Sequence, residues 1–309
     1  MDFGAHLPLI DFEGNPRTLE HLIEFAAGAE QLGYAALSVN DHLLFPKPWL
    51  DGPTALAAVL HATRRIALMT SVALPVVRGP IALAKTLAAI DILSGGRLIV
   101  GVGPGSSPLD FAAVNVPFAE RWLRLDESVK ALRTLWDQGS TPFRGRFYST
   151  DGVSLEPFPP QSSGPRIWIG SWGSDAGLRR VARLADGWLA SAYNTTPSAF
   201  AAGKKKLNGY LEKNSKAPNQ FPNAIATMWT YVTENHSDAE RVMGDHITSM
   251  INRPEQDLWD QLCIGPADVC AEKLSAYRGA GADRVILWPI VDELRQIELF
   301  KERVEPLIA

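Results

Sequence analysis

The chain has very little cysteine. Cys263 and Cys270 are the two cysteines in its 309 residues, and six residues lie between them. This spacing fits no common metal-binding or redox motif, so we expect no metal site. Unpaired cysteines are usual in a reducing compartment, and the sequence therefore predicts a cytoplasmic protein.

Long apolar runs and long runs of one charge are also lacking. No apolar stretch approaches the roughly 18 residues that a membrane span requires. The first residues contain no basic segment followed by an apolar one, so no signal peptide is expected. The net charge is −4, and the one cationic run, residues 204–206, is short. We therefore expect neither a membrane nor a nucleic acid as partner.

What the chain does contain is a regular alternation of apolar, strand-like runs with segments of helical period. This alternation favours a parallel sheet with crossover helices. Eight strands are predicted, at residues 3–7, 36–39, 66–73, 97–102, 167–170, 187–190, 225–233 and 284–288. Eight strands with helices between them favour the α/β class and a (β/α)8 TIM barrel over an open, doubly wound sheet.

Two segments interrupt the alternation. They cover residues 138–165, which include five prolines, and residues 252–265. We interpret both as insertions in a single barrel domain that spans residues 1–309, a length that such a barrel accommodates. Within the first insertion we expect a short hairpin over residues 147–155.

Several sequence blocks resemble one family. The blocks are residues 83–85 through 93–97 into 101–105, 118–121 with 126–127, 155–157 into 165–170, and 183–188. They resemble the luciferase-like monooxygenase family, occur in the family's order and extend over roughly residues 3–190. The resemblance implies a (β/α)8 barrel that binds reduced FMN or the deazaflavin coenzyme F-420 and acts on a small organic substrate.

The end of the second strand narrows this choice. Residues 38–42, Ser-Val-Asn-Asp-His, resemble the deazaflavin branch more than the FMN branch. The first hypothesis is therefore an oxidoreductase that passes a hydride between coenzyme F-420 and a small organic substrate. The resemblance also suggests a homodimer and a separate enzyme that reduces the cofactor.

Two alternatives stay open. One is a two-component monooxygenase that uses reduced FMN and O2. The other is a non-catalytic flavin-binding barrel. Sugar-phosphate dehydrogenases of the deazaflavin branch carry an acidic residue soon after the glycine loop, whereas here Ser106 and Ser107 follow Gly105 and the first carboxylate is Asp110. The missing acidic residue after Gly105 is the reason to keep the non-catalytic alternative.

Two histidines are the candidates for catalysis, because catalytic groups of such barrels lie at the carboxyl ends of strands. His42 follows the second strand and could donate a hydrogen bond to a flavin carbonyl or move a proton. His6 lies near the end of the first strand and is the second candidate, with the alternative that it is a hydrogen-bonded core histidine. Asp41 is assigned to cofactor binding, with the alternative that Asp41 and His42 only cap a turn.

Two strand ends could lie against the flat cofactor ring. In relatives, a non-prolyl cis bond presses on the central ring near the position of Ser71 and Val72, and the resemblance implies the same here. The alternative is that Ser71 and Val72 form an ordinary strand end. After the fourth strand, Gly103 and Gly105 would let the backbone pass close to the ring. Their spacing lacks the features of a dinucleotide-binding fingerprint.

The loop after the fifth strand is the candidate phosphate site. It consists of Gly170, Ser171, Trp172, Gly173 and Ser174 and precedes a predicted helix. Free N–H groups at a helix amino terminus, together with serine hydroxyls, suit a cofactor phosphate. The alternative is that Ser174 simply caps the helix.

Tryptophans mark the candidate substrate pocket. Trp49, Trp229 and Trp288 fall near the expected barrel mouth. Aromatic side chains there could wall an apolar pocket and shield a reduced cofactor from water. For any single tryptophan, ordinary packing is the alternative.

Overall fold

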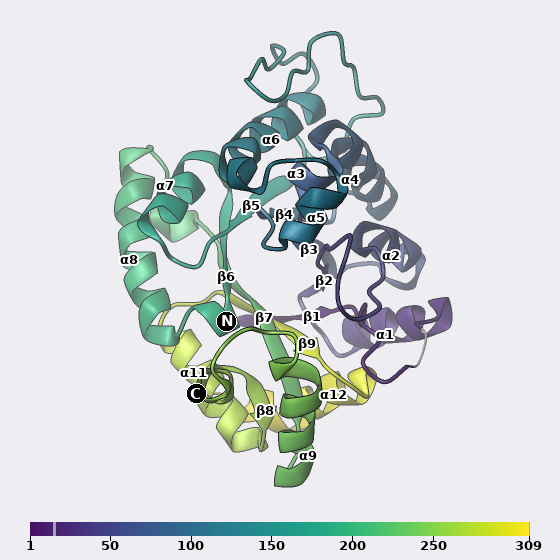
Figure 1. Ribbon diagram of the computed structural model, residues 1–309, viewed down its shortest axis with the longest axis vertical. Helices are drawn as coiled ribbons and strands as arrows, with labels where there is room; N and C mark the ends of the chain where they lie inside the picture. Colours follow the sequence, from purple (N-terminus) through teal and green to yellow (C-terminus); the bar gives the residue numbers. More distant parts are fainter. Residues whose placement is uncertain (15–16, 309) are drawn as a thin grey trace.

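The computed structural model describes residues 1–14 and 17–308, and its centre is a closed parallel barrel (Figure 1). The barrel strands are β1 (Asp2–His6), β2 (Ala36–Val39), β3 (Ala67–Ala73), β4 (Leu98–Val102), β5 (Arg166–Gly170), β6 (Gly187–Ser191), β7 (Asn223–Val232) and β9 (Arg284–Pro289). They pair in the order β6-β5-β4-β3-β2-β1-β9-β7, and a β6–β7 pairing closes the ring. The fold is therefore a (β/α)8 TIM barrel, and the predicted strand bounds agree within two residues.

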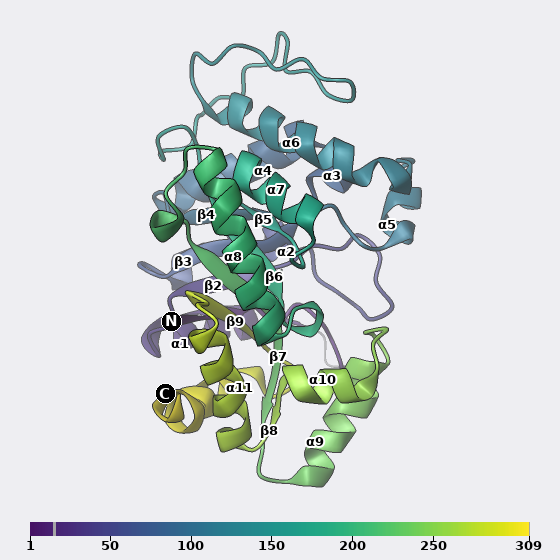
Figure 2. The ribbon, with the colours of Figure 1, turned by 90° about the vertical axis from the view of Figure 1, so that its left-hand side faces the viewer.

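Helices surround this barrel (Figures 1 and 2). They are α1 (Leu19–Gln31), α2 (Gly52–Ala58), α3 (Pro75–Arg78), α4 (Pro80–Ser94), α5 (Pro108–Ala113), α6 (Arg121–Trp136), α7 (Asp175–Leu184), α8 (Pro197–Lys213), α9 (His236–Val242), α10 (Glu255–Gln261), α11 (Ala267–Gly279) and α12 (Glu293–Leu299). Helices α7 and α8 lie side by side against the β5–β6 side of the barrel, as Figure 2 shows. In residues 1–14 and 17–308, none of these helices combines the length and the apolar character needed to cross a bilayer.

Helix α4 illustrates how local sequence sets the elements. Pro80 occupies the first turn, where a missing N–H removes no helical hydrogen bond. The helix ends at Ser94 because Gly95 adopts the left-handed conformation, with φ 72°, which glycine tolerates without a steric cost. Leu83, Leu87 and Ile90 are buried, and this spacing places them on the face that covers the barrel.

Side-chain direction along the strands decides which residues line the lumen. Phe3 contacts Phe300 at 4.8 Å between ring centroids, so Phe3 points outward to the helices. Trp188 also points outward, because its ring stacks on Phe200 of α8 at 4.6 Å between centroids. Because side chains alternate along a strand, the neighbours Gly4 and His6 point into the lumen. The pairing of His6 with Ser38 extends this inward row to β2.

The segment before β5 corrects one sequence-based expectation. The hairpin predicted over residues 147–155 is wrong, since only an isolated bridge joins Arg144 and Ser149. Glu127 of α6 accepts hydrogen bonds from the backbone N–H groups of Arg146 and Phe147, at 2.9 and 2.7 Å. These donors are thereby occupied by a carboxylate and cannot form a strand ladder.

The second interruption of the sequence pattern contains regular structure. Residues 252–265 include α10 and a short ninth strand, β8 (Cys263–Gly265). Strand β8 pairs in parallel with the carboxyl end of β7, from Thr230 to Val232. It therefore extends the sheet beyond the closed barrel on the β7 side of the mouth.

Candidate active site

Six inward-facing polar atoms of the barrel strands have no hydrogen-bond partner among the described residues, and five of them belong to residues in the carboxyl-terminal half of their strand. They are His6 Nε2, Ser38 Oγ, Ser71 Oγ, Trp168 Nε1, Trp229 Nε1 and Trp288 Nε1. A buried polar atom without a partner costs about 1–3 kcal/mol, and native cores contain few of them. A concentration of such atoms at one end of a barrel therefore marks a binding site for a polar ligand.

One half of the mouth, on β3 to β5, is built from small residues. Val72, Gly103 and Gly170 meet there, and we call them the glycine half. A Cβ added to Gly103 would lie 2.6 Å from Val72 Cγ2, and one added to Gly170 would lie 3.5 Å from Val72 Cγ1. The Ser71–Val72 peptide bond is cis. Gly105, at φ 82°, continues this loop next to Phe111.

The opposite half, on β7, β9 and β1, is built from rings. His6, Trp49, Trp229 and Trp288 form what we call the aromatic half. His6 stacks on Trp288 at 3.7 Å between centroids, and Trp229 meets Trp288 edge-on at 4.7 Å. Trp49 lies 6.5 Å from Trp288. The structure thus brings together the three tryptophans that the sequence assigned to a substrate pocket.

His6 is a neutral ring. Its Nδ1 donates a hydrogen bond to the carbonyl oxygen of Leu7 at 2.7 Å, so the proton is on Nδ1 and Nε2 can only accept. Burial lowers the pKa of His6 to about 3, although the hydrogen bond to the Leu7 carbonyl and the nearby Asn40 side chain oppose this. At neutral pH the aromatic half therefore carries no charge from His6.

His42 forms a pair with a buried carboxylate. Its Nδ1 lies 3.0 Å from Oδ2 of Asp110, a residue of α5 that is fully buried. The other oxygen, Oδ1, accepts the backbone N–H of Leu44 at 2.8 Å. Burial acts to raise the pKa of Asp110, but the hydrogen bonds from His42 and Leu44 hold this pKa below its ordinary value.

An ionised Asp110 decides the tautomer of His42. A carboxylate can only accept, so the proton of a neutral His42 ring is on Nδ1. Nε2 then remains for a ligand, and no hydrogen bond from the described residues occupies it. The rings of Phe45 and Trp49, each 5.1 Å away, connect His42 to the aromatic half. This pair can accept or donate one proton at the mouth.

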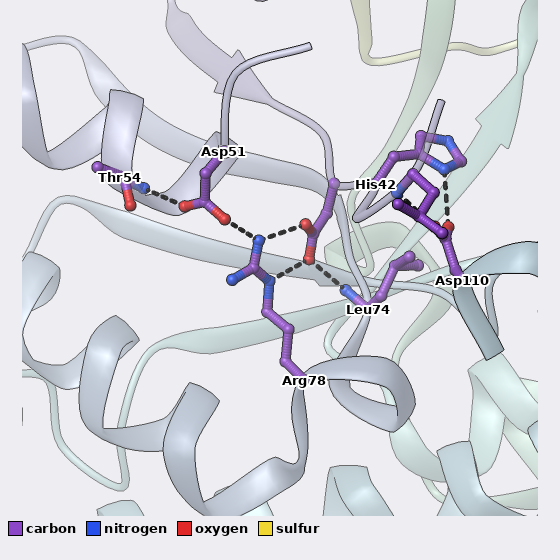
Figure 3. Close-up of polar contacts among 8 residues, drawn as sticks. His42, Asp51, Thr54, Leu74, Arg78 and Asp110 are labelled. Carbon is purple, nitrogen blue, oxygen red and sulfur yellow. Dashed lines mark hydrogen bonds and ion pairs between the residues drawn. The ribbon is translucent and has the colours of Figure 1, made fainter. Parts of the chain in front are cut away.

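A second ionic group fixes the loop that carries His42 (Figure 3). Asp41 accepts two hydrogen bonds from Arg78, at 2.7 and 2.6 Å, and a third from the backbone N–H of Leu74. Arg78 also contacts Asp51, which caps α2 through the N–H of Thr54. Because the Asp41 carboxylate is buried and occupied, a contact between Asp41 and a cofactor would use its backbone. The cofactor-binding role of Asp41 stays a prediction.

The loop 170–174 joins β5 to α7. Ser174 caps the helix by accepting the N–H of Gly177 at 3.2 Å, and Ser171 accepts the N–H of Gly173 at 3.3 Å. Trp172 is 57% exposed, and the guanidinium of Arg253 lies 5.9 Å from its ring. The capping alternative for Ser174 is therefore present in the structure, and the phosphate contact stays a prediction.

Sequence reasoning missed several residues of this site. Ser38 and Trp168 belong to the polar lumen, and the two-residue alternation of β2 and β5 was the signal that could have placed them inward. The partnership of Asp110 with His42 had no local signal, because 68 residues separate the two. His246, which lies near the aromatic half, was not singled out either.

Comparison with known proteins decides the family. The family model described as luciferase-like monooxygenase matches residues 10–256. The chain belongs to this family. Its barrel, and the site at the barrel mouth, are therefore those of a luciferase-like protein.

Curated relatives agree with this assignment. An uncharacterised protein of Mycobacterium tuberculosis is 36% identical over 165 residues, 53% of this chain and 55% of that protein. A protein of Amycolatopsis mediterranei named F-420-dependent glucose-6-phosphate dehydrogenase is 32% identical over 55% of this chain and 53% of that protein. Its namesake in Nakamurella multipartita is 28% identical over 92% and 91%. The chain thus spans about half the length of the first curated relatives that it matches.

A solved structure supports the fold. An F-420-dependent secondary alcohol dehydrogenase, in complex with an F-420–acetone adduct, aligns with a TM-score of 0.84 and 19% identity over 100% of this chain and 99% of that chain. At this identity the likeness concerns the fold alone.

Proposed function

We propose that this luciferase-like protein is an oxidoreductase that passes a hydride between coenzyme F-420 and a small organic substrate. The names of the Amycolatopsis and Nakamurella relatives support the choice of cofactor. The observation that carries the proposal is the buried His42–Asp110 pair at the barrel mouth, beside the bare backbone of Gly103 and Gly170. A proton-transfer group next to a flat binding surface suits hydride chemistry on a carbonyl or an alcohol.

The lumen fits a flat, polar group. The glycine half offers a surface without side chains beyond Val72, and the unpaired atoms of Ser38, Ser71 and Trp168 offer partners for carbonyl and N–H groups. We assign Ser71, Val72, Gly103, Gly105 and the loop 170–174 to the cofactor. When bound, coenzyme F-420 supplies or accepts the hydride, and the remaining work belongs to the protein.

That work is proton transfer and orientation. His42 holds a proton on Nδ1 through Asp110 and presents Nε2 to the substrate oxygen, where it removes a proton from an alcohol or returns one to a ketone. Asp41 and Arg78 hold the loop from which His42 projects. The rings of the aromatic half exclude water from the reacting groups.

The test is a parallel equilibrium titration of the purified protein with coenzyme F-420 and with FMN, followed by quenching of tryptophan fluorescence. Low-micromolar binding of F-420 and none of FMN is the expected result. A panel of secondary alcohols and ketones is then assayed by the absorbance of the oxidised deazaflavin. Preferential binding of FMN, with O2 uptake in the presence of reduced FMN, would replace the proposal with the two-component monooxygenase.

Turnover separates the proposal from the non-catalytic alternative. If F-420 binds but no member of the panel is converted, and His42→Ala alters nothing but affinity, a flavin-binding barrel is the better description. A homodimer and a separate reductase stay predictions that the same preparation can address by light scattering and by reconstitution.

A further inference from the structure

A continuous row of rings extends from the aromatic half to a buried histidine that the proposed function does not use. Trp288 meets Trp229 at 4.7 Å, Trp229 meets Phe12 at 6.0 Å, and Phe12 meets His246 at 5.1 Å between centroids. Phe12 comes from the loop after β1, and His246 from the helical turns after β7. Three segments far apart in the sequence thus converge on one side of the mouth.

His246 has an unusual environment for a histidine. It is 6% exposed, and neither ring nitrogen has a hydrogen-bond partner among the described residues. It lies in a π-helical segment, Met243–Thr248, which continues α9. Buried polar groups are normally paired, and single π-helical turns are frequent at functional sites. Both observations indicate that the ring nitrogens of His246 bind a ligand.

The charges around His246 are balanced. The negative charges of Asp245 and Glu13 act to raise the pKa of His246, and the positive charges of Lys47 and Arg241 act to lower it. Burial lowers the pKa of His246, so a neutral ring with one donor and one acceptor nitrogen prevails near pH 7. The group is therefore suited to a hydroxyl or a carbonyl and not to an ion.

The tryptophans restrict the ligand further. An indole N–H can only donate, and the N–H groups of Trp49, Trp229 and Trp288 are buried and unpaired. In residues 1–14 and 17–308, no lysine or arginine lies over any of these three rings. A ligand here needs accepting oxygens and a flat apolar surface.

We propose that Phe12, Trp229, Trp288 and His246 form the substrate subsite, that it takes a planar, uncharged ring compound bearing a ketone or hydroxyl oxygen, and that His246 determines specificity for that oxygen. This inference rests on the proposed function in one respect, because it assigns the glycine half to the cofactor. It differs from the sugar-phosphate substrate that the names of the curated relatives describe.

The test compares two ligands that differ by one oxygen. Binding of 1-tetralone and of tetralin to the cofactor-free protein is measured by quenching of tryptophan fluorescence. We expect the ketone to bind about tenfold more tightly, which corresponds to about 1.4 kcal/mol. His246→Phe, which keeps an aromatic ring, should reduce this preference to less than about threefold. His246→Gln, which keeps hydrogen-bonding capacity, should retain most of it.

His236→Gln is the matched control, because His236 is exposed on α9 and pairs with Glu240. It should leave the preference unchanged. Equal binding of the two ligands to the wild type would overturn the proposal, and so would a His246→Phe variant that keeps the full preference. Displacement of tetralone by glucose 6-phosphate would also overturn it. If His246→Phe fails to fold, as near-UV circular dichroism would show, His246→Leu takes its place, with the same expected loss of preference.

Titration of the same variants with coenzyme F-420 separates this inference from the proposed function. The assay with tetralone needs no cofactor. A wild type that prefers tetralone but does not bind F-420 would support the subsite and overturn the cofactor assignment. Loss of F-420 binding in His246→Phe would place His246 in the cofactor site and overturn the subsite.

Discussion

The two halves of the barrel mouth are built in opposite ways. In the glycine half, Gly103 and Gly170 leave the backbone bare around Val72. In the aromatic half, Trp229, Trp288 and His6 fill the space with rings whose polar atoms lack partners. A bare surface accepts one flat group of fixed shape, whereas rings with free donors select a ligand by its oxygens. The proposed function thus assigns recognition of cofactor and of substrate to separate physical means within one lumen.

His42 lies between the halves, and its loss should have the largest effect. We expect His42→Ala to lower kcat by about 10²–10⁴-fold, the usual contribution of a general acid or base. The affinity for F-420 should change by less than about threefold, because neither half is altered. Steady-state kinetics with the substrate found in the panel, alongside F-420 titration, measures both. His236→Ala serves as control, and a comparable loss in that variant would remove the special role of His42.

The aromatic half should be unsuited to charge. The pKa of His6 is about 3 in the folded protein, well below the ordinary value of about 6.5. As the pH falls below 6.5, the unfolded chain binds a proton at His6 that the folded protein does not bind. The stability that His6 contributes is present above this pH and is lost progressively down to about pH 3.

This loss amounts to about 2 kcal/mol between pH 7 and pH 5. His6→Phe should not show it, so the difference in unfolding free energy between variant and wild type should shift by that amount. Urea unfolding at a series of pH values makes the measurement, with His61→Phe, at an exposed position, as control. Parallel pH profiles for wild type and His6→Phe would mean that the aromatic half tolerates an imidazolium.

In the glycine half, an added methyl group should weaken cofactor binding by steric conflict. In Gly103→Ala the new Cβ would lie 2.6 Å from Val72 Cγ2, so Val72, which we assign to the cofactor surface, must move. We expect F-420 to bind at least about tenfold more weakly, while tetralone binds as before. Gly209→Ala on α8, where a Cβ meets no atom within 4 Å, should leave both affinities intact. If Gly103→Ala weakened the binding of F-420 and of tetralone equally, the two halves would not bind separate ligands.

The smallest effect concerns an unpaired hydroxyl. Ser38 is fully buried, and its Oγ has no partner among the described residues. Ser38→Ala should raise the free energy of unfolding by up to about 1 kcal/mol, because an unsatisfied group is removed. It should also weaken F-420 binding by a few-fold. Ser128→Ala on α6 removes a similar unpaired hydroxyl far from the mouth and should stabilise the protein without changing affinity.

Several parts of the site could be predicted because their signals are local. Asp41 and His42 lie just beyond the end of β2, and the segment from Gly170 to Ser174 begins at the last residue of β5, so the rule that barrel sites lie at strand ends was sufficient to select them. Trp229 and Trp288 were selected for the same reason. The hairpin over 147–155 failed because Glu127, about 20 residues earlier, binds the backbone that the pattern assigned to a strand.

The class of fold could be predicted from the amino-acid sequence, since the two-residue period of the strands and the helical period between them are properties of neighbouring residues. The sequence also indicated the family, whose blocks are contiguous stretches. Three contacts became visible only in the folded chain: Asp110 binds His42, Arg78 binds Asp41, and Phe12 and His246 lie beside the tryptophans. The physical reason is closure of the barrel, which brings side chains together across the mouth at distances that no local period encodes.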